Sequence, residues 1–241
     1  MPSLLRRQLF TVAGNSNERT LTLSSTSNDG HYLSLRPLVK PTTEAETAFP
    51  FEWAFFGTNE DIKSTIESPT KLTHVFDFGF DANVYLNIPN THRGPVETHW
   101  IVWDSGCLQE AGFVFPFGSE KPGVEFMELW QPIDINRDEY VIVPEDKQKG
   151  RSVVLSVDCE KYHGMVIVVG KWVQGILADK KESTTLGLSF VRSVEESDGK
   201  YKTLIKYGKD FEKFPTTFND LSVGSSVDVN GATWKVLEAT Y

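Results

Sequence analysis

The apolar segment at residues 164–177 restricts the fold more than any other stretch of the sequence. Every side chain at residues 165–169 is apolar and three are β-branched valines, which is typical of a strand buried on both faces of a sheet. Glycines on both sides of this run favour a strand over a buried helix. A membrane span needs about 18 apolar residues, and Lys171 interrupts the run well before that length. The sequence therefore predicts a central strand around which the rest of the chain folds.

Segments with alternating polar and apolar residues flank several tight turns. Residues 19–24 and 32–36 alternate in this way, and the turn between them contains Asp29-Gly30. The same arrangement recurs at Asp198-Gly199 and at Asn230-Gly231, where glycine adopts a positive φ without steric cost. The spacing gives roughly fourteen to sixteen short strands with scarcely any helical periodicity. We therefore expect an all-β chain built from antiparallel hairpins.

Alternating phenylalanines suggest how the interior of the first half is filled. One triplet occupies residues 76–80 and a second occupies residues 113–117, so the three rings of each triplet share one face of a strand. Residues 58–71, which precede the first triplet, form a polar stretch with at most one helical turn. The candidate barrel-lining residues are Trp53, Phe76, Phe78, Phe80, Phe113, Phe115 and Phe117. In a narrow barrel such rings fill the interior more often than they line a pocket.

The polar segment at residues 133–140 predicts a linker between two domains. A new strand series begins after it, with apolar residues at 140–144 and 152–157 separated by a charged loop. We place the domains at residues 1–140 and 141–241.

Charge and cysteine content restrict the partners and the compartment. The net charge of −9 repels nucleic acid, and no basic cluster offsets it. The first residues lack the apolar core of a secretory signal, and Cys107 and Cys159 lie far apart. No asparagine has the hydroxyl residue two positions on that glycosylation requires. These features predict a protein of the reducing cytosol that binds no nucleic acid and does not span a membrane.

Motifs associated with catalysis are incomplete. Asp77-Phe78-Gly79 matches the magnesium motif of kinases, but its companion motifs are missing. Residues 164–171 do not match a phosphate-binding loop, because five residues instead of four separate the two glycines and Trp172 replaces the metal-binding hydroxyl. Among the carboxylates, Glu52 and Glu125 are the ones whose strand setting favours a raised pKa, and an outward-facing acid is the simpler interpretation.

A single group of residues offers potential nucleophile or ligand chemistry. It consists of His92, His99, Asp104 and Cys107. The hypothesis of a histidine-activated thiolate requires Cys107 to lie within hydrogen-bond reach of a histidine. Because cysteine and histidine also have ordinary structural roles, we expect no catalytic residue, no metal site and no cofactor, and predict that the protein is not an enzyme.

Long strings of residues resemble a small fungal family. They include Asn17-Glu18-Arg19-Thr20, Asp29-Gly30-His31-Tyr32, Phe49-Pro50-Phe51-Glu52-Trp53-Ala54-Phe55, Trp103-Asp104-Ser105-Gly106-Cys107 and Glu128-Leu129-Trp130-Gln131-Pro132. That family consists of cytosolic proteins from budding yeasts and is named for association with a casein-kinase-I type protein kinase. The resemblance implies two consecutive lipocalin-like β-barrels, a homodimer, and a cytoplasmic and also nuclear location. It further implies contacts with the kinase and with a component on the cytosolic side of the ER translocation machinery.

Three functions follow as hypotheses. The first is a non-enzymatic cytosolic protein-interaction module, which agrees with the incomplete motifs and with the resemblance. The second is a carrier or sensor of a small apolar ligand held in a β-barrel cavity. The third is an enzyme that uses Cys107 and a histidine, which fails if these side chains lie apart.

Overall fold

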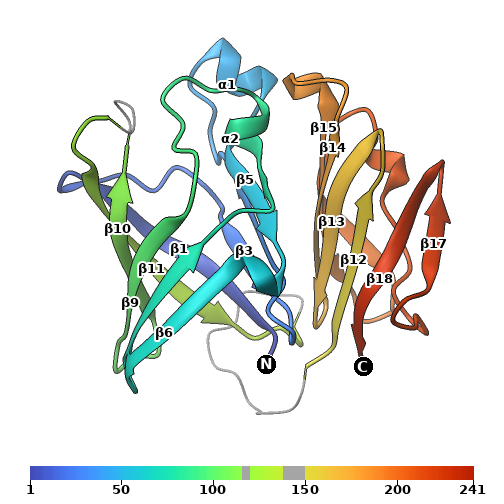
Figure 1. Cartoon of the computed structure of the whole chain (residues 1–241). Helices are drawn as coiled ribbons and strands as arrows, with labels where there is room; N and C mark the ends of the chain where they lie inside the picture. The colour runs from blue at the N-terminus through green and yellow to red at the C-terminus, as the bar shows by residue number, and fades with distance from the viewer. Residues whose placement is uncertain (116–119, 138–149) are drawn as a thin grey trace. The chain divides into compact units, whose positions relative to one another are not determined.

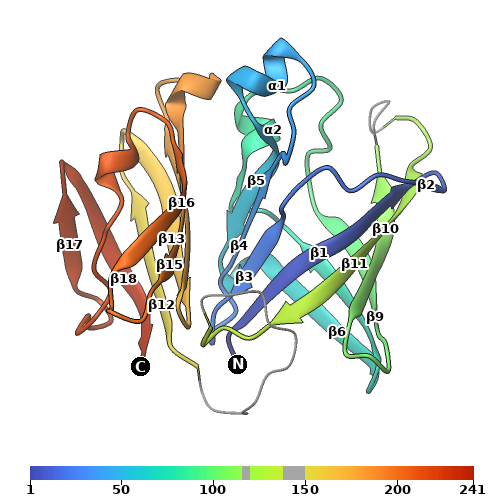
Figure 2. The ribbon, with the colours of Figure 1, turned by 180° about the vertical axis from the view of Figure 1, so that it is seen from behind.

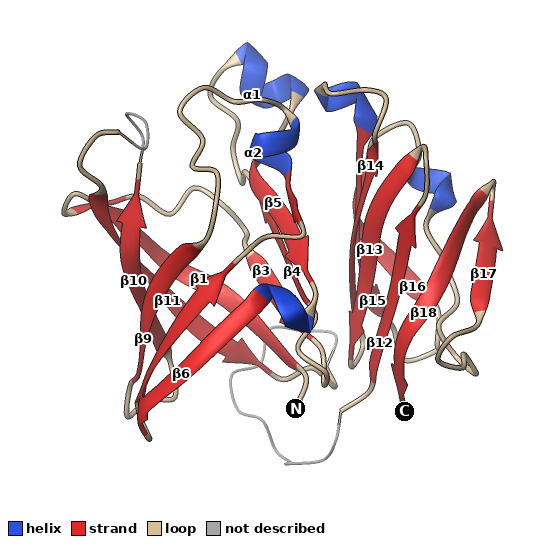
Figure 3. Cartoon of the chain, viewed as in Figure 1, coloured by secondary structure: helices blue, strands red, loops and turns tan. Residues whose placement is uncertain are grey.

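The computed structural model describes residues 1–115, 120–137 and 150–241, and strands dominate it (Figures 1 and 3). The helical elements are short: α1 (Glu44–Ala48), α2 (Ala82–Tyr85), η1 (Asn59–Asp61), η2 (Thr185–Gly187) and η3 (Phe211–Lys213). The all-β prediction is confirmed. Within the described residues, no helix has the length and apolar character to cross a membrane.

An antiparallel sheet of eleven strands contains most of the first half of the chain. Its order is β6 (Ile62–Ser68), β7 (Lys71–Phe76), β9 (Val96–Val102), β10 (Leu108–Val114), β11 (Val124–Ile133), β1 (Ser3–Val12), β3 (Leu23–Thr26), β4 (Tyr32–Pro37), β5 (Phe51–Gly57) and β8 (Phe80–Asp81), with β2 (Asn15–Ser16) paired to β1. β7 lies near one end of this order and β8 at the other, yet three residues connect them. Because three residues span only about 10 Å, the sheet must curl until its two ends approach each other.

A second antiparallel sheet has seven strands. Its order is β16 (Tyr201–Tyr207), β15 (Leu188–Glu195), β14 (Trp172–Asp179), β13 (Tyr162–Val169), β12 (Ser152–Asp158), β18 (Ala232–Thr240) and β17 (Ser226–Val229). Figure 2 shows β16 and β17 as the two edges of this sheet. Both sheets are barrel-like, and in the part of the chain that the structure describes no ladder joins the two edge strands of either one.

The chain divides into two compact units, and each contains pieces that are distant in sequence. The N-terminal unit comprises residues 5–24 and 34–132, and the C-terminal unit comprises residues 1–4, 25–33 and 133–241. Within the C-terminal unit, Ser25 Oγ accepts a hydrogen bond from Gln174 Nε2 at 2.8 Å, which ties the end of β3 to β14 of the second sheet. The predicted domain boundary at residue 140 and the predicted strand at 140–144 lie outside the described residues.

The apolar run becomes β13, the middle strand of the second sheet, which confirms the prediction. All residues from 164 to 169 are buried, so both faces of the strand are covered. Val166 and Val168 contribute to one core cluster, together with Trp234 and with Phe214 and Phe218 from the segment after η3. The close packing of this core leaves no room for a side chain at Gly175, because a Cβ there would lie 2.9 Å from the Phe214 ring.

The predicted turns are confirmed. Gly30 (φ 88°) lies between β3 and β4, and Gly199 (φ 78°) lies between β15 and β16. Asn230 (φ 47°) and Gly231 (φ 81°) join β17 to β18, and positive φ at both positions is the type I′ geometry that suits a two-residue hairpin.

Of the predictions for residues 58–80, one is confirmed and one is wrong. The polar stretch contains the predicted helical turn as η1, and it continues into β6, a strand that the sequence did not predict and that pairs with β7, with Lys63 opposite Val75. Phe76, Phe78 and Phe80 do not share one strand, because β7 ends at Phe76 and β8 begins at Phe80. The backbone N–H of Asp77 donates to the carbonyl of Asp61 at 2.7 Å, and this contact draws the chain away from the β7 ladder towards β5.

Candidate functional site

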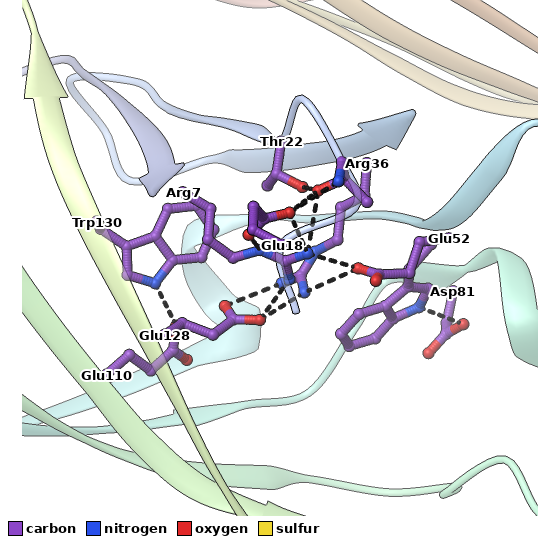
Figure 4. A network of polar contacts seen from close by, with 11 residues as sticks. Arg7, Glu18, Thr22, Arg36, Glu52, Asp81, Glu110, Glu128 and Trp130 are labelled. Carbon is purple, nitrogen blue, oxygen red and sulfur yellow. Dashed lines mark hydrogen bonds and ion pairs between the residues drawn. The ribbon is translucent and has the colours of Figure 1, made fainter. Parts of the chain in front are cut away.

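The inner face of the N-terminal unit contains an unusual number of charged side chains. Burial alternates along β11, where Phe126, Glu128 and Trp130 are buried and their neighbours are more exposed. On the paired strand β10, the same inner face contains Glu110 and Gly112. Carboxylates therefore point into an interior that also contains aromatic rings. Figure 4 shows how this group of side chains lies.

Arg7, from β1, is the centre of the group, and its side chain is 0% exposed. Its Nε atom donates to Glu18 at 2.7 Å, while its two terminal nitrogens contact Glu128 at 2.6 Å and Glu52 at 2.8 Å (Figure 4). A further bond from Arg7, of 3.0 Å, reaches the hydroxyl of Thr20. Burial alone lowers the pKa of Arg7, but the surrounding carboxylates outweigh it and raise the pKa above the usual value.

Arg36, from β4, shares the carboxylate of Glu128 with Arg7. Its guanidinium donates to Glu128 at 2.8 Å and lies 4.9 Å from the ring centroid of Trp53 and 5.8 Å from that of Trp130. Ion pairs and cation–π contacts of this kind compensate for removing charge from water. We call Arg7, Arg36, Glu18, Glu52 and Glu128 the arginine–glutamate network.

Two further carboxyl groups lie beside the network and accept indole N–H bonds. Trp130 Nε1 donates to Glu110 at 2.9 Å, and Trp53 Nε1 donates to Asp81 at 2.9 Å. Burial, followed by the negative charge of Glu128, raises the pKa of Glu110 to about 8. Burial also raises the pKa of Asp81. Glu110 is therefore mainly protonated at neutral pH.

The charged side chains of this interior bond mainly to one another. Burial would raise the pKa of Glu18, but hydrogen bonds from Arg7 and Thr20 lower it below the usual value, so that the ion pair with Arg7 persists. In the described ranges, no three His, Cys, Asp or Glu side chains are placed to hold a metal ion. The arrangement stabilises charges that face one another within the unit.

The structure brings together three of the predicted barrel-lining residues. The ring of Trp53 lies 5.3 Å from Phe78, and Phe78 lies 6.1 Å from Phe76, measured between ring centroids. Phe55 completes this cluster at 4.3 Å from Trp53. All but Phe55 are half-buried.

The other predicted residues lie elsewhere. Phe80 is buried but stacks on Phe56 at 5.2 Å, on β5. Phe113 is 51% exposed, because on β10 it lies on the face opposite to Glu110 and Gly112, so its predicted interior position is wrong. Phe115 stacks on His92 at 5.1 Å, and Phe117 lies outside the described residues.

The histidine and cysteine group does not converge. His99 contacts Glu97 and Thr73, and His92 contacts the carbonyl of Pro95 at 3.1 Å. Trp103 lies four residues beyond His99, and its backbone N–H donates to the carbonyl of Cys107. At 3.3 Å per residue, Cys107 therefore lies about 13 Å further along the ladder than His99. The hypothesis that His99 activates the Cys107 thiol therefore fails.

Sequence reasoning missed the main members of the network. Glu52 was singled out as an acid within a strand and does belong to the network, whereas Glu125 is exposed. Arg7, Glu110 and Glu128 were not singled out. The alternation of Glu128 with the aromatic residues 126 and 130 is the one local signal that indicates an inward-facing acid.

A family model described as Protein HRI1 matches residues 3–238. The chain belongs to the HRI1 family. Protein HRI1 from Vanderwaltozyma polyspora is 52% identical over 243 residues, and the match covers 100% of both chains. Protein HRI1 from Saccharomyces cerevisiae is 51% identical over 242 residues, with 99% of each chain covered. Among solved structures, a crystal structure of the uncharacterized protein YLR301w from Saccharomyces cerevisiae matches with a TM-score of 0.95, 50% identity and 100% coverage of both chains. The similarity to the HRI1 family thus extends through sequence and fold.

Proposed function

We propose that this HRI1-family protein is a non-catalytic protein-interaction module that associates through the exposed edge of β6. The observation that supports this most directly is the exposure of β6 on both faces. Residues 63–67 are all exposed, and Ile66 retains 79% of its surface. Among the described residues, β6 pairs only with β7, so its other edge presents backbone groups to the exterior. Such an edge is a template for adding another strand.

The occupant that we propose for this edge is β6 of a second copy. If two β6 strands run antiparallel with Thr65 opposite Thr65, Lys63 of each copy faces Glu67 of the other. The two-fold symmetry then forms this ion pair twice, and cross-strand Thr–Thr pairs are also favourable. Glu67 lies at a bulge, and its carboxylate accepts a bond of 2.6 Å from Thr73, which holds it on the same face as Lys63. Lys63 is thus the cation that faces Glu67 across the two copies, and the pairing does not require Lys71.

Further partners belong to the same proposal. The resemblance to the yeast family supports association with a casein-kinase-I type kinase and with a component on the cytosolic side of the ER translocation machinery. It also supports a cytoplasmic and nuclear location and lipocalin-like barrels. The inference that the protein is not an enzyme is supported by the arginine–glutamate network, whose charged groups bond to one another.

Charge exchange on β6 tests the homodimer. We expect the wild type to be dimeric by native mass spectrometry and sedimentation velocity. Lys63→Glu and Glu67→Lys each place like charges opposite one another twice, and we expect each to weaken dimerisation about tenfold or more. An equimolar mixture of the two variants restores both ion pairs and should form a heterodimer. The double variant Lys63→Glu/Glu67→Lys should again form a homodimer.

A matched control is Lys202→Glu on β16, an exposed lysine in the C-terminal unit, which should leave the mass unchanged. A wild type that stays monomeric at all concentrations, or single variants that dimerise normally, would contradict the β6 homodimer. For the kinase, we expect the immobilised wild type to retain a purified casein-kinase-I type kinase at moderate salt. Absence of retention would refute that association and leave the homodimer test unaffected.

A further inference from the structure

A cleft of about 530 Å³ opens in the C-terminal unit beside the β16 edge. Val173 of β14, and Val191 and Ser193 of β15, form its floor, and Tyr201 and Thr203 of β16 form one wall. The opposite wall is the segment that begins at η3 and continues to Asn219. This volume lies within the range of about 300–1,000 Å³ that is usual for small-molecule sites.

Contacts at both ends hold the segment opposite β16. At one end, the indole of Trp234 donates to the carbonyl of Lys213 at 2.8 Å. At the other end, Arg151 donates to Asn219 at 2.7 Å and to the hydroxyl of Tyr201 at 3.1 Å, so a single guanidinium bridges the two walls. The cleft is therefore preformed, which lowers the entropic cost of binding.

The interior surface of the cleft combines apolar and aromatic side chains with polar groups. Phe214 and Phe218 belong to the core of the unit and also line the cleft. Tyr201 lies edge-on to Phe218 at 5.5 Å between ring centroids. Beside these groups, Ser193 lines the cleft, and its side-chain hydroxyl makes no hydrogen bond with any described residue. A hydroxyl that opens into a cleft can donate a hydrogen bond to a ligand and accept one from it.

Charged groups at the rim are already paired. Lys200 contacts Asp198 at 2.8 Å, and Glu212 contacts Lys206 at 2.7 Å. Among the described residues that line the cleft, both charged side chains are therefore in ion pairs, and neither is left uncommitted to attract an ion.

We propose that this cleft binds a neutral, mainly apolar small molecule with one hydrogen-bonding group, which contacts Ser193 while its apolar body packs on Val173, Val191 and the aromatic wall. The site gives the small-molecule hypothesis a definite location in the C-terminal unit. It is independent of the β6 edge, so either proposal can fail without the other.

Fluorescence titration with N-phenyl-1-naphthylamine tests the site, because this neutral probe has one N–H group and becomes brighter in apolar surroundings. We expect saturable binding to the wild-type full chain. Thr203→Trp places an indole in the cleft and should weaken binding at least about tenfold. Leu204→Trp adds the same indole to the neighbouring residue, which does not line the cleft and is 43% exposed, and should leave binding unchanged.

A second comparison isolates the hydroxyl. Ser193→Ala should weaken binding of N-phenyl-1-naphthylamine about threefold to tenfold, the usual effect of one hydrogen bond, without weakening binding of the hydrocarbon 1-phenylnaphthalene. Circular dichroism and thermal unfolding show whether each variant is folded, and Ser193→Ala decides the question if Thr203→Trp does not fold. Absence of saturable binding to the wild type, or equal losses for Thr203→Trp and Leu204→Trp, would overturn the proposal. Equal losses of both probes on Ser193→Ala would overturn the role of the hydroxyl.

Discussion

Replacing Glu110 by glutamine should change how the stability of the N-terminal unit depends on pH. The pKa of Glu110 is 4.5 when unperturbed and about 8 in the folded protein, since burial and Glu128 oppose its ionisation. The folded state therefore binds this proton more tightly than the unfolded chain does. Stability from this group is fully present below pH 4.5 and is lost as the pH rises to about 8.

The size of the effect follows from the same values. The interval from 4.5 to about 8, at about 1.36 kcal/mol for each pH unit, corresponds to roughly 5 kcal/mol. Glutamine keeps an oxygen that accepts the Trp130 indole N–H, has nearly the same size and does not ionise. Glu110→Gln should therefore resemble the wild type near pH 4.5 and exceed its stability by several kcal/mol at pH 8.

Urea unfolding at pH 5, 6, 7, 8 and 9, followed by tryptophan fluorescence, measures this difference. Comparing the variant with the wild type at each pH cancels contributions from other groups, including His74, whose pKa burial lowers. The indole N–H resonance of Trp130 supplies a local readout, because its chemical shift should titrate near pH 8 in the wild type alone. A stability difference that stays constant from pH 5 to pH 9 would refute a neutral, buried Glu110.

Three further substitutions test the packing of the two units. Arg7→Met leaves Glu18 and Glu52 without their buried cation and should destabilise the N-terminal unit by about 3–5 kcal/mol in urea unfolding; a loss below about 1 kcal/mol would contradict the central role of Arg7. Gly170→Ala should markedly lower the melting temperature of the C-terminal unit, because φ is 56° and the new Cβ would lie 2.1 Å from the carbonyl oxygen of Ile135. Gly199→Ala is the matched control: its φ is also positive, but the space around it is open, so only the backbone cost of about 1–2 kcal/mol should appear.

Local chemistry was enough to predict several elements from the sequence. The apolar run at residues 165–169 indicated a doubly buried strand, and β13 is the middle strand of its sheet. Asn230-Gly231 predicted a hairpin because both residues tolerate positive φ, and the structure shows that turn. In each case, the residues that determine the structure lie next to one another in the chain.

Which faces of the strands became interior depended on how the sheets fold up in space. Period-two alternation shows that Phe113 and Phe115 share a face in an extended strand, but it does not show which face the curled sheet encloses, and Phe113 lies outside. The arginine–glutamate network was equally inaccessible, because Arg7 and Glu128 are 121 residues apart and meet only when β1 pairs beside β11. Strands and turns could thus be predicted from the sequence, because they depend on near neighbours in the chain. The charged interior and the cleft beside β16 arose from strand order and curvature, which depend on contacts between distant parts of the chain.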